Sequence, residues 1–598
     1  MALLIFAWSF LLLISWTIGT SILNVVRADC FERRGDRAIL AVWLGIMLLA
    51  IALLAVSLIA PLTPFVGSAI ALVLVSIALR SRATRVEAIS LYQSISQKHL
   101  FVFLGIAIFT AFFASQKVTI DDTGLYHFQV IQWLSKHGTV PGLALIHFTF
   151  GYPCSWLALA APFNAGFLEG QAASLTGGFV FLILALQLSI CLSHIFENRQ
   201  KFEDWFFVAT ASLSFPILLG SGLVASPSPD VPTIGLTILT AWTIVVACNR
   251  RKNINNYLIP LILATAALTV KLSALCLFVT AFLFFILNSR HNLFHCLKGS
   301  AIVFLLILPM LGFGFIASGC PVFPVSLICF DFLPWSVGKE TARRITQIIH
   351  DCSKWMCLPG APQNVEGLNW LWYWIQFQKQ TFFLIICSFT SLLGLFEFAS
   401  LHRIKGDKFI AILGISGTLF VLYGNPFLRI GLGYFIVIPA FLLALFCHSR
   451  SRFRAIAVLV TSGTANSWIG FSHTYFAIFG LTLTLTLIVW FYSSKISNIA
   501  FLTFLLVTLL IVPVKLHITQ PTTQLFLLLP PQFQPPTPIS FVRKQVNDVE
   551  YLSPDREPHF FNPCWNAPLP CTPELTHNDI RLRNPERGIQ KGFVRNSF

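Results

Sequence analysis

Long apolar runs separated by short polar loops make up most of the chain. A helix needs about 17 to 25 apolar residues to cross the hydrocarbon core of a bilayer. Runs of this kind occupy residues 2–26, 39–60, 62–79, 100–116, 172–194, 205–225, 231–248, 301–319, 380–400, 408–424, 430–447, 455–471, 473–492 and 498–514. The first run lacks a basic leader and an A-x-A cleavage site, so we expect it to be a retained helix. The pattern predicts an all-α integral membrane protein with roughly 13 to 16 transmembrane or half-membrane helices.

The apolar stretch 257–288 departs from this pattern. Basic loops flank both of its ends, and Lys271 interrupts its middle. One long helix would place the two basic flanks on opposite sides of the membrane, against the preference of Lys and Arg for cytoplasmic loops. We therefore predict a hairpin of two short helices that meet at VKLSA, with Lys271 at its outward apex.

The basic residues predict the orientation of the chain. The formal net charge is +16, but the Lys and Arg residues gather in short loops between apolar runs, which orients a membrane protein and does not indicate nucleic acid as a partner. The predicted cytoplasmic loops are ADCFERRGDRA, RSRATRVEAISLYQSISQK, ENRQKFED, NRRKNINN, NSRHNLFHCLK, LHRIKGDK and HSRSRFR. The predicted outer segments are the one after Ser115, the turns near Asp230 and Arg429, residues 320–380 and the chain after about Pro513.

Composition agrees with this topology and divides the chain. Hydrophobic residues make up 56% of the sequence and the mean hydropathy is +0.77, values that exclude a single soluble domain. We predict N-terminal accessory membrane helices over 1–98, a catalytic membrane core over 99–447 with outer loops 117–171 and 320–379, and C-terminal membrane helices over 448–514. A Pro-rich linker and a small extracytoplasmic tail occupy 515–598.

Several cysteines lie in the predicted outer segments. Cys320, Cys329, Cys352 and Cys357 fall in the long outer loop, where an oxidising compartment would allow disulfides and packed free thiols are the alternative. CWNAPLPC in the polar tail predicts a bridge between Cys564 and Cys571. No pairing of C-x-x-C motifs has the spacing of a zinc finger.

The stretch IDDTGLYHFQVIQWLSKHG places two carboxylates directly after an apolar run. Apolar side chains then recur at helical spacing up to Leu134, with polar residues between them, which predicts a helix lying in the membrane interface and ending at Gly138. A desolvated corner raises the pKa of a carboxylate and suits it to accept a proton or to hold a divalent cation such as Mg²⁺ or Mn²⁺. Asp122 is alternatively an N-cap of the helix. A cap does not explain two successive acids, so we favour Asp121 as catalyst without excluding Asp122.

Other charged residues stand at predicted helix ends on the same side. Lys271 and Arg429 suit a lipid phosphate or pyrophosphate, Lys as a point charge and Arg as a bidentate fork, with snorkelling towards the headgroups as the alternative. Asp230 is either a second acid of the site or a helix cap. His127 either assists Asp121, binds donor phosphate or is a buried hydrogen-bonded histidine.

The order of these motifs resembles bacterial GT-C-type membrane glycosyltransferases. The resemblance rests on the acidic pair after a span, the Tyr126–His127 pair, the following helix and GYPCSW, and then on VASPSPDVPT, TVKLSA, SGCPVFP and FLRIGLGYF. These motifs cover most of the chain from Phe101 to Cys447. The resemblance implies transfer of a sugar from a polyprenyl-phosphate donor to an acceptor on the non-cytoplasmic face, with a carboxylate of the first outer loop as base or metal ligand.

We therefore expect a transferase in the bacterial inner (plasma) membrane, with its site facing the periplasm or exterior and a glycan, lipid or protein as acceptor. A lipid-linked saccharide flippase or transporter would instead show inverted repeats and charges near the bilayer midplane. A polysaccharide polymerase or ligase uses similar donors on another membrane fold. A non-catalytic polyprenyl-lipid-binding protein is the remaining alternative.

Overall fold

The computed structural model describes residues 1–31, 33–171, 173–250, 253–357, 367–399, 404–448, 526–531, 539–555 and 562–596. Ten helices of this part are long and apolar enough to cross a membrane, or eleven if the bent pair α3–α4 counts as one. The helices are α1 Ala2–Val26, α2 Arg34–Ser57, α3 Pro64–Arg80, α4 Arg82–Ser94, α5 Gln97–Ala114, α6 Phe128–Lys136, α7 Leu143–Ile146, α8 Ser155–Ala160, α9 Ala173–Phe196, α10 Phe202–Gly220, α11 Asp230–Asn249, α12 Leu258–Val270, α13 Leu275–Ser289, α14 Leu293–Ser318, α15 Lys339–Asp351, α16 Trp370–Phe377, α17 Lys379–Ala399, α18 Asp407–Gly424 and α19 Leu428–His448.

The predicted spans are confirmed as helices as far as residue 447, and the runs 455–471, 473–492 and 498–514 lie outside the described residues. The chain is a mostly helical integral membrane protein. One basic stretch predicted as a loop is itself partly helical: α4 turns by 98° from α3, and the Ser81 hydroxyl caps it by accepting from the Thr84 amide at 3.4 Å.

The hairpin prediction for 257–288 is confirmed. Helices α12 and α13 are joined by a short turn over Leu272–Ala274 and pack side by side. At the open end, the rings of Tyr257 and Phe284 lie 5.4 Å apart. Lys271, the C-cap of α12, therefore stands at the apex of the hairpin.

Several of the predicted cytoplasmic loops meet at one end of the bundle, called here the basic end. Arg33 donates two hydrogen bonds to the Asp204 carboxylate, at 2.7 and 2.8 Å, and Arg250 donates to Glu203 at 2.5 Å. Asn256 donates to Asp29 at 2.8 Å. Loops that lie far apart in the sequence are thus joined by paired charges, which is how buried ions are normally tolerated.

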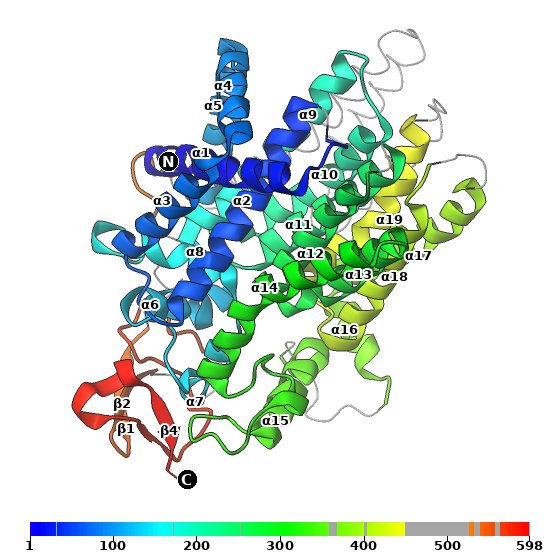
Figure 1. The fold of residues 1–598 in the computed structure, drawn as a ribbon. Coiled ribbons are helices and arrows are strands. Elements are labelled where there is room, and N and C mark those ends of the chain that lie inside the picture. The colour runs from blue at the N-terminus through cyan, green and yellow to red at the C-terminus, as the bar shows by residue number, and fades with distance from the viewer. Residues whose placement is uncertain are drawn as a thin grey trace.

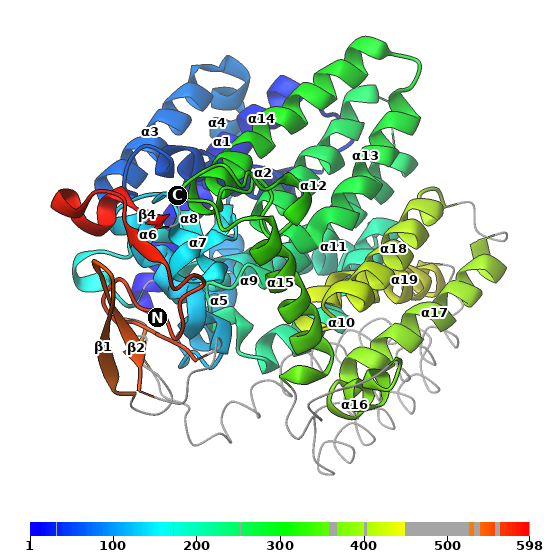
Figure 2. The same ribbon diagram turned by 90° about the horizontal axis from the view of Figure 1, so that it is seen from below.

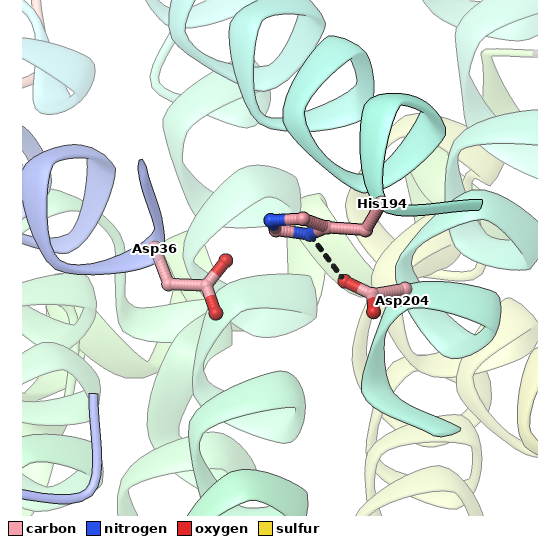
Figure 3. A group of neighbouring side chains, drawn as sticks. All are labelled: Asp36, His194 and Asp204. Atoms are coloured by element: carbon pink, nitrogen blue, oxygen red, sulfur yellow. Dashed lines mark hydrogen bonds and ion pairs between the residues drawn. The ribbon is translucent and has the colours of Figure 1, made fainter. Parts of the chain in front are cut away.

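Asp36, His194 and Asp204 lie at the centre of the basic end (Figure 3). Their ligand atoms are close enough to hold a metal ion, within 4.8 Å of one another. Both Asp204 oxygens, however, accept from Arg33, and one also accepts from the Lys201 amide at 2.7 Å. Because a guanidinium already neutralises this carboxylate, we interpret the group as a structural ion-pair network.

The opposite end carries the loops 117–171 and 320–379 and the C-terminal segment, defined as residues 539–596; it is called here the tail end (Figures 1 and 2). Helix α6 lies where the sequence predicts, and every residue from Phe128 to Ser135 is buried within the protein. Its polar face contacts protein instead of headgroups: Gln129 and Gln132 donate to backbone carbonyls of the C-terminal segment.

In its described residues the C-terminal segment contains short strands and one 3-10 helix, Pro585–Lys591, and no α-helix, which corrects the all-α prediction for this part of the chain. Strands β1 Phe541–Val546 and β2 Val549–Pro554 form one antiparallel pair, and β3 Ile580–Leu582 and β4 Phe593–Arg595 form another. The amides of Thr576 and Phe593 donate to the carbonyls of Ile146 and Pro141 at 3.2 and 2.9 Å, so the segment is docked on the first large loop.

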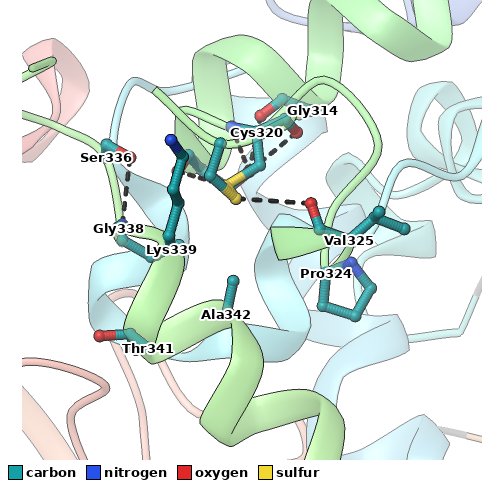
Figure 4. Close-up of a disulfide and its surroundings, with 12 residues drawn as sticks. Gly314, Cys320, Pro324, Val325, Ser336, Gly338, Lys339, Thr341 and Ala342 are labelled. Carbon is teal, nitrogen blue, oxygen red and sulfur yellow. Dashed lines mark hydrogen bonds between the residues drawn. A yellow bond between two sulfur atoms is a disulfide. The ribbon is translucent and has the colours of Figure 1, made fainter. Parts of the chain in front are cut away.

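Six cysteines form three disulfides, all at the tail end: Cys320–Cys329, Cys352–Cys357 and Cys564–Cys571. The predicted Cys564–Cys571 bridge is confirmed, and the loop cysteines are paired. Cys320 follows α14 and lies close to the start of α15, where the Gly338 amide donates to the Ser336 hydroxyl at 3.1 Å (Figure 4). The remaining eight cysteines form no disulfide.

The ion-pair network of the basic end predicts a large stability loss for Asp204→Ala. This change leaves the Arg33 guanidinium largely buried without its main partner, which costs about 3 kcal/mol in comparable buried pairs. The thermal midpoint of the purified protein should fall clearly, whereas Glu340→Ala, which removes a carboxylate with an 88% exposed side chain on α15, should leave it unchanged. Equal midpoints for the two variants would contradict the structural role of the network.

Candidate functional site

Four of the predicted site residues meet at the tail end, although they come from four distant segments of the chain. Asp122 precedes a π-helix over Thr123–His127, Asp230 is the first residue of α11, Lys271 caps α12, and Arg429 lies in the first turn of α19. The starts of α11 and α19 and the end of α12 thus lie together, and each of these apolar helices places one charged residue there. These four residues are called here the charge cluster.

The charge cluster consists of two carboxylates and two cations in contact. Arg429 Nη2 lies 2.6 Å from Asp122 Oδ2, and Arg429 Nε lies 3.8 Å from Asp230 Oδ2. Lys271 forms an ion pair with the other oxygen of Asp230. The Asp230 side chain is only 2% exposed, so its charge depends on these partners. The Lys271 and Arg429 side chains are 22% and 29% exposed, so both reach the surface.

Asp121 differs from its neighbour. Its side chain is exposed and has no ion pair or hydrogen bond among the described residues. Partial desolvation and the adjacent Asp122 carboxylate raise the pKa of Asp121, and the positive charge of Arg429 opposes them. Asp122, in contrast, makes no side-chain cap bond, so its predicted alternative as an N-cap is wrong. One carboxylate is bound to a cation and the other remains available to a proton.

The π-helix that follows the acidic pair is hydrogen-bonded to the turn before α11. A π-turn holds one more residue than an α-turn and is often found at functional sites. Here the Thr123 hydroxyl lies 2.7 Å from the Ser226 hydroxyl, and Ser226 in turn accepts from the Ser228 amide at 3.0 Å. The Ser228 hydroxyl donates to Asp230 at 3.1 Å. A chain of hydrogen bonds through these hydroxyl groups and the Ser228 amide therefore connects the segment of Asp121 and Asp122 with Asp230.

These hydroxyl groups were not among the predicted site residues. Ser226 and Ser228 flank the prolines of SPSPD, a pattern that indicates a turn before a helix, and nothing in the sequence links this turn to Thr123. The turn that leads to Arg429 is likewise fixed by a distant residue, since Trp374 Nε1 of α16 donates to the Pro426 carbonyl at 3.0 Å.

His127 is buried beside the charge cluster. Its Nδ1 lies 3.4 Å from the Thr123 hydroxyl, and its Nε2 has no hydrogen-bond partner among the described residues. Burial lowers the pKa of His127 to about 4, so the ring is neutral near pH 7. His127 is therefore buried, as one of its three predicted interpretations requires, with one weak hydrogen bond. Tyr126 and Tyr152 pack edge to face nearby, with ring centroids 6.1 Å apart.

Asp121 and Asp122 do not form a good site for the divalent cation that the sequence suggested. The Asp122 carboxylate is engaged by Arg429 at 2.6 Å. Within the described part of the chain, Asp121 and Asp122 join no group of three ligand atoms close enough to share an ion. Lys271 and Arg429 already supply the positive charge that a metal would bring.

The buried pairing of Asp230 with Lys271 predicts strong coupling in a double-mutant cycle. Asp230→Asn and Lys271→Met should each lower stability by about 3 kcal/mol, because the first leaves Lys271 without its carboxylate and the second leaves the buried Asp230 with only the more distant cation, Arg429. The double variant should regain at least about 1 kcal/mol of the summed loss. The control is the Lys136–Glu169 pair, 2.7 Å apart with side chains 43% and 46% exposed, whose Met and Gln variants should show coupling below about 1 kcal/mol. Additive losses at Asp230 and Lys271 would contradict the pairing.

Comparisons with known proteins give one family whose matched range includes all residues of the charge cluster. No match was found among the curated proteins or the solved structures. The model of one family, described as "Domain of unknown function (DUF8201)", matches residues 1–436, which include Asp121, Asp122, Asp230, Lys271 and Arg429. The C-terminal segment lies outside the matched range. With most of its length covered, the chain belongs to the DUF8201 family.

Proposed function

We propose that the protein is a GT-C-like membrane glycosyltransferase that moves a sugar from a polyprenyl-phosphate donor to an acceptor on the extracytoplasmic face. The observation that carries the proposal is the pairing of one free carboxylate, Asp121, with two partly exposed cations, Lys271 and Arg429, at one end of the helix bundle. Glycosyl transfer needs these two features together: a base for the acceptor and positive charge for the departing phosphate.

The donor side is formed by Lys271 and Arg429. Asp122 and Asp230 hold the two cations in place before the donor binds, so little reorganisation is needed when the lipid phosphate arrives. The guanidinium binds phosphate oxygens as a fork and the ammonium binds as a point charge. As the bond between the anomeric carbon and the phosphate oxygen breaks, its electron pair leaves with polyprenyl phosphate, and the two cations stabilise that charge.

The acceptor side is formed by Asp121. Its carboxylate takes the proton of the attacking hydroxyl or amine while the acceptor atom bonds to the anomeric carbon. A raised pKa makes Asp121 a stronger base than an ordinary surface carboxylate. His127 is neutral and buried, so its proposed role is to shape the wall of the site and not to carry a proton.

Orientation and location follow from the two ends of the bundle. The basic loops at the basic end favour the cytoplasm. The six disulfide cysteines all lie at the tail end, and disulfides persist in oxidising compartments. These observations support a site that faces the periplasm or exterior of a bacterial plasma membrane. The cluster lies at helix ends, whereas a flippase or transporter is expected to bind its substrate near the bilayer midplane.

Asp121→Asn should abolish transfer. Purified protein is incubated with radiolabelled polyprenyl-phosphate sugars and an envelope extract, and transfer should fall by at least about 100-fold, since a general base contributes about that much. EDTA should leave the wild-type rate unchanged, because the acidic pair is a poor ion site. The control is Glu340→Gln, on the exposed face of α15.

The same assay tests the protonation state. Asp121 acts as a base only when deprotonated, so the wild-type rate should be full above its raised pKa and fall as the pH drops through that pKa. The residual rate of Asp121→Asn should lack this acid limb. Transfer by Asp121→Asn at the wild-type rate would refute the assignment.

A further inference from the structure

The C-terminal segment packs against residues 118–129, which include the acidic pair, and the Trp565 side chain lies in this contact. Trp565 is 1% exposed and belongs to an apolar cluster with Val118, Phe128 and Ala225, against which Ile120 and Ile539 also pack. Val118 and Ile120 lie just before Asp121, Phe128 follows the π-helix, and Ala225 adjoins Ser226. The apolar cluster that contains the indole therefore joins residues from both segments that the hydrogen-bond chain connects.

The backbone contacts at this point are specific. The Trp565 amide donates to the Gly124 carbonyl at 2.7 Å, and a Cβ on Gly124 would lie 2.5 Å from the indole ring. Only glycine therefore lets the ring approach the π-helix this closely. Gln129 donates to the carbonyls of Trp565 and Ala567, each at 3.0 Å, which ties the next turn of the same helix to the loop.

The loop that carries Trp565 is held in a conformation its sequence does not favour. Trp565 has a φ of +49°, a left-handed value that costs a bulky residue of the order of 1 kcal/mol or more. The Cys564–Cys571 disulfide closes the loop around it, and the Leu552 amide of β2 donates to the Pro570 carbonyl at 3.0 Å. Strained residues persist where the surrounding contacts determine them, and they concentrate at functional sites.

We infer that Trp565 is a positioning residue for Asp121 and Asp122, so that the disulfide-closed loop of the C-terminal segment is part of the site. The inference rests on the proposed function for its catalytic meaning. Trp565 acts by fixing the π-helix that follows the acidic pair, and so holds the pair near α11 and Arg429. Residue 565 lies beyond the range matched by the family model, so the family match does not supply this role.

The first experiment measures the local stability of residues 118–129, which include the acidic pair, and does not depend on activity. Hydrogen exchange is followed in the full-length protein for Trp565→Ala, Trp565→Phe and Trp335→Ala. Trp565→Ala should speed amide exchange over residues 118–129 at least about fivefold, because the local opening free energy falls. Trp565→Phe should stay close to wild type, since the indole N–H has no hydrogen-bond partner among the described residues. Trp335→Ala, at another tryptophan of the tail end that packs on Phe315, should leave 118–129 unchanged.

If Trp565→Ala does not fold, Cys564→Ser with Cys571→Ser takes its place, because it releases the loop and retains the indole. It should also speed exchange over 118–129, whereas Cys352→Ser with Cys357→Ser should not. Unchanged exchange over 118–129 in the folded variant would overturn the inference.

The second experiment tests whether the loss of Trp565 also affects catalysis. In the transfer assay, Trp565→Ala should lower kcat about 10-fold or more with little change in the donor KM, since misplacing a catalytic group by a fraction of an ångström has effects of this size. Faster exchange with an unchanged kcat would overturn the positioning role. Absence of transfer in the wild type as well would refute the proposed function, and the exchange data would still decide whether Trp565 fixes the corner.

Discussion

The pairing of Asp230 with Lys271 and Arg429 determines how the tail end of the bundle is built. A carboxylate that is 2% exposed is unstable without cations. Its partners come from the apex of the α12–α13 hairpin and from the first turn of α19, so both elements must end at the level where α11 begins. Arg429 contacts Asp230 through Nε and Asp122 through Nη2, and the second contact holds the first large loop at the same end.

The same physical constraint acts at the other end with a different outcome. At the basic end, Arg33 and Arg250 are matched with Asp204 and Glu203, and the Asp204 carboxylate has no free oxygen. At the tail end, Asp121 stays free beside a bound carboxylate, and the two cations remain partly exposed. Because of this difference we interpret the basic end as a structural network and propose the tail end as a site for an anion and a proton.

The sequence was informative where a charge interrupts an apolar pattern. Lys271 and Arg429 are conspicuous in such runs, and the charge rule alone forced the hairpin at 257–288. Asp121 and Asp122 were conspicuous for the same reason. The periodic apolar residues of α6 predicted a helix but could not show that the C-terminal segment covers its polar face. Ser226, Ser228 and Trp565 were missed because ordinary turn and interface residues gain their roles only from contacts far apart in the chain.

The measurement that tests the central claim most directly is binding of the leaving group itself. Polyprenyl phosphate and the matching polyprenyl alcohol are titrated into the purified wild type, Lys271→Met with Arg429→Gln, and Lys339→Met as a control on the exposed lysine of α15. The charge cluster predicts that the wild type and the control bind the phosphate more tightly than the alcohol, and that the double variant loses this preference while retaining the alcohol affinity. Equal affinity of the wild type for the two lipids would contradict a phosphate site at Lys271 and Arg429.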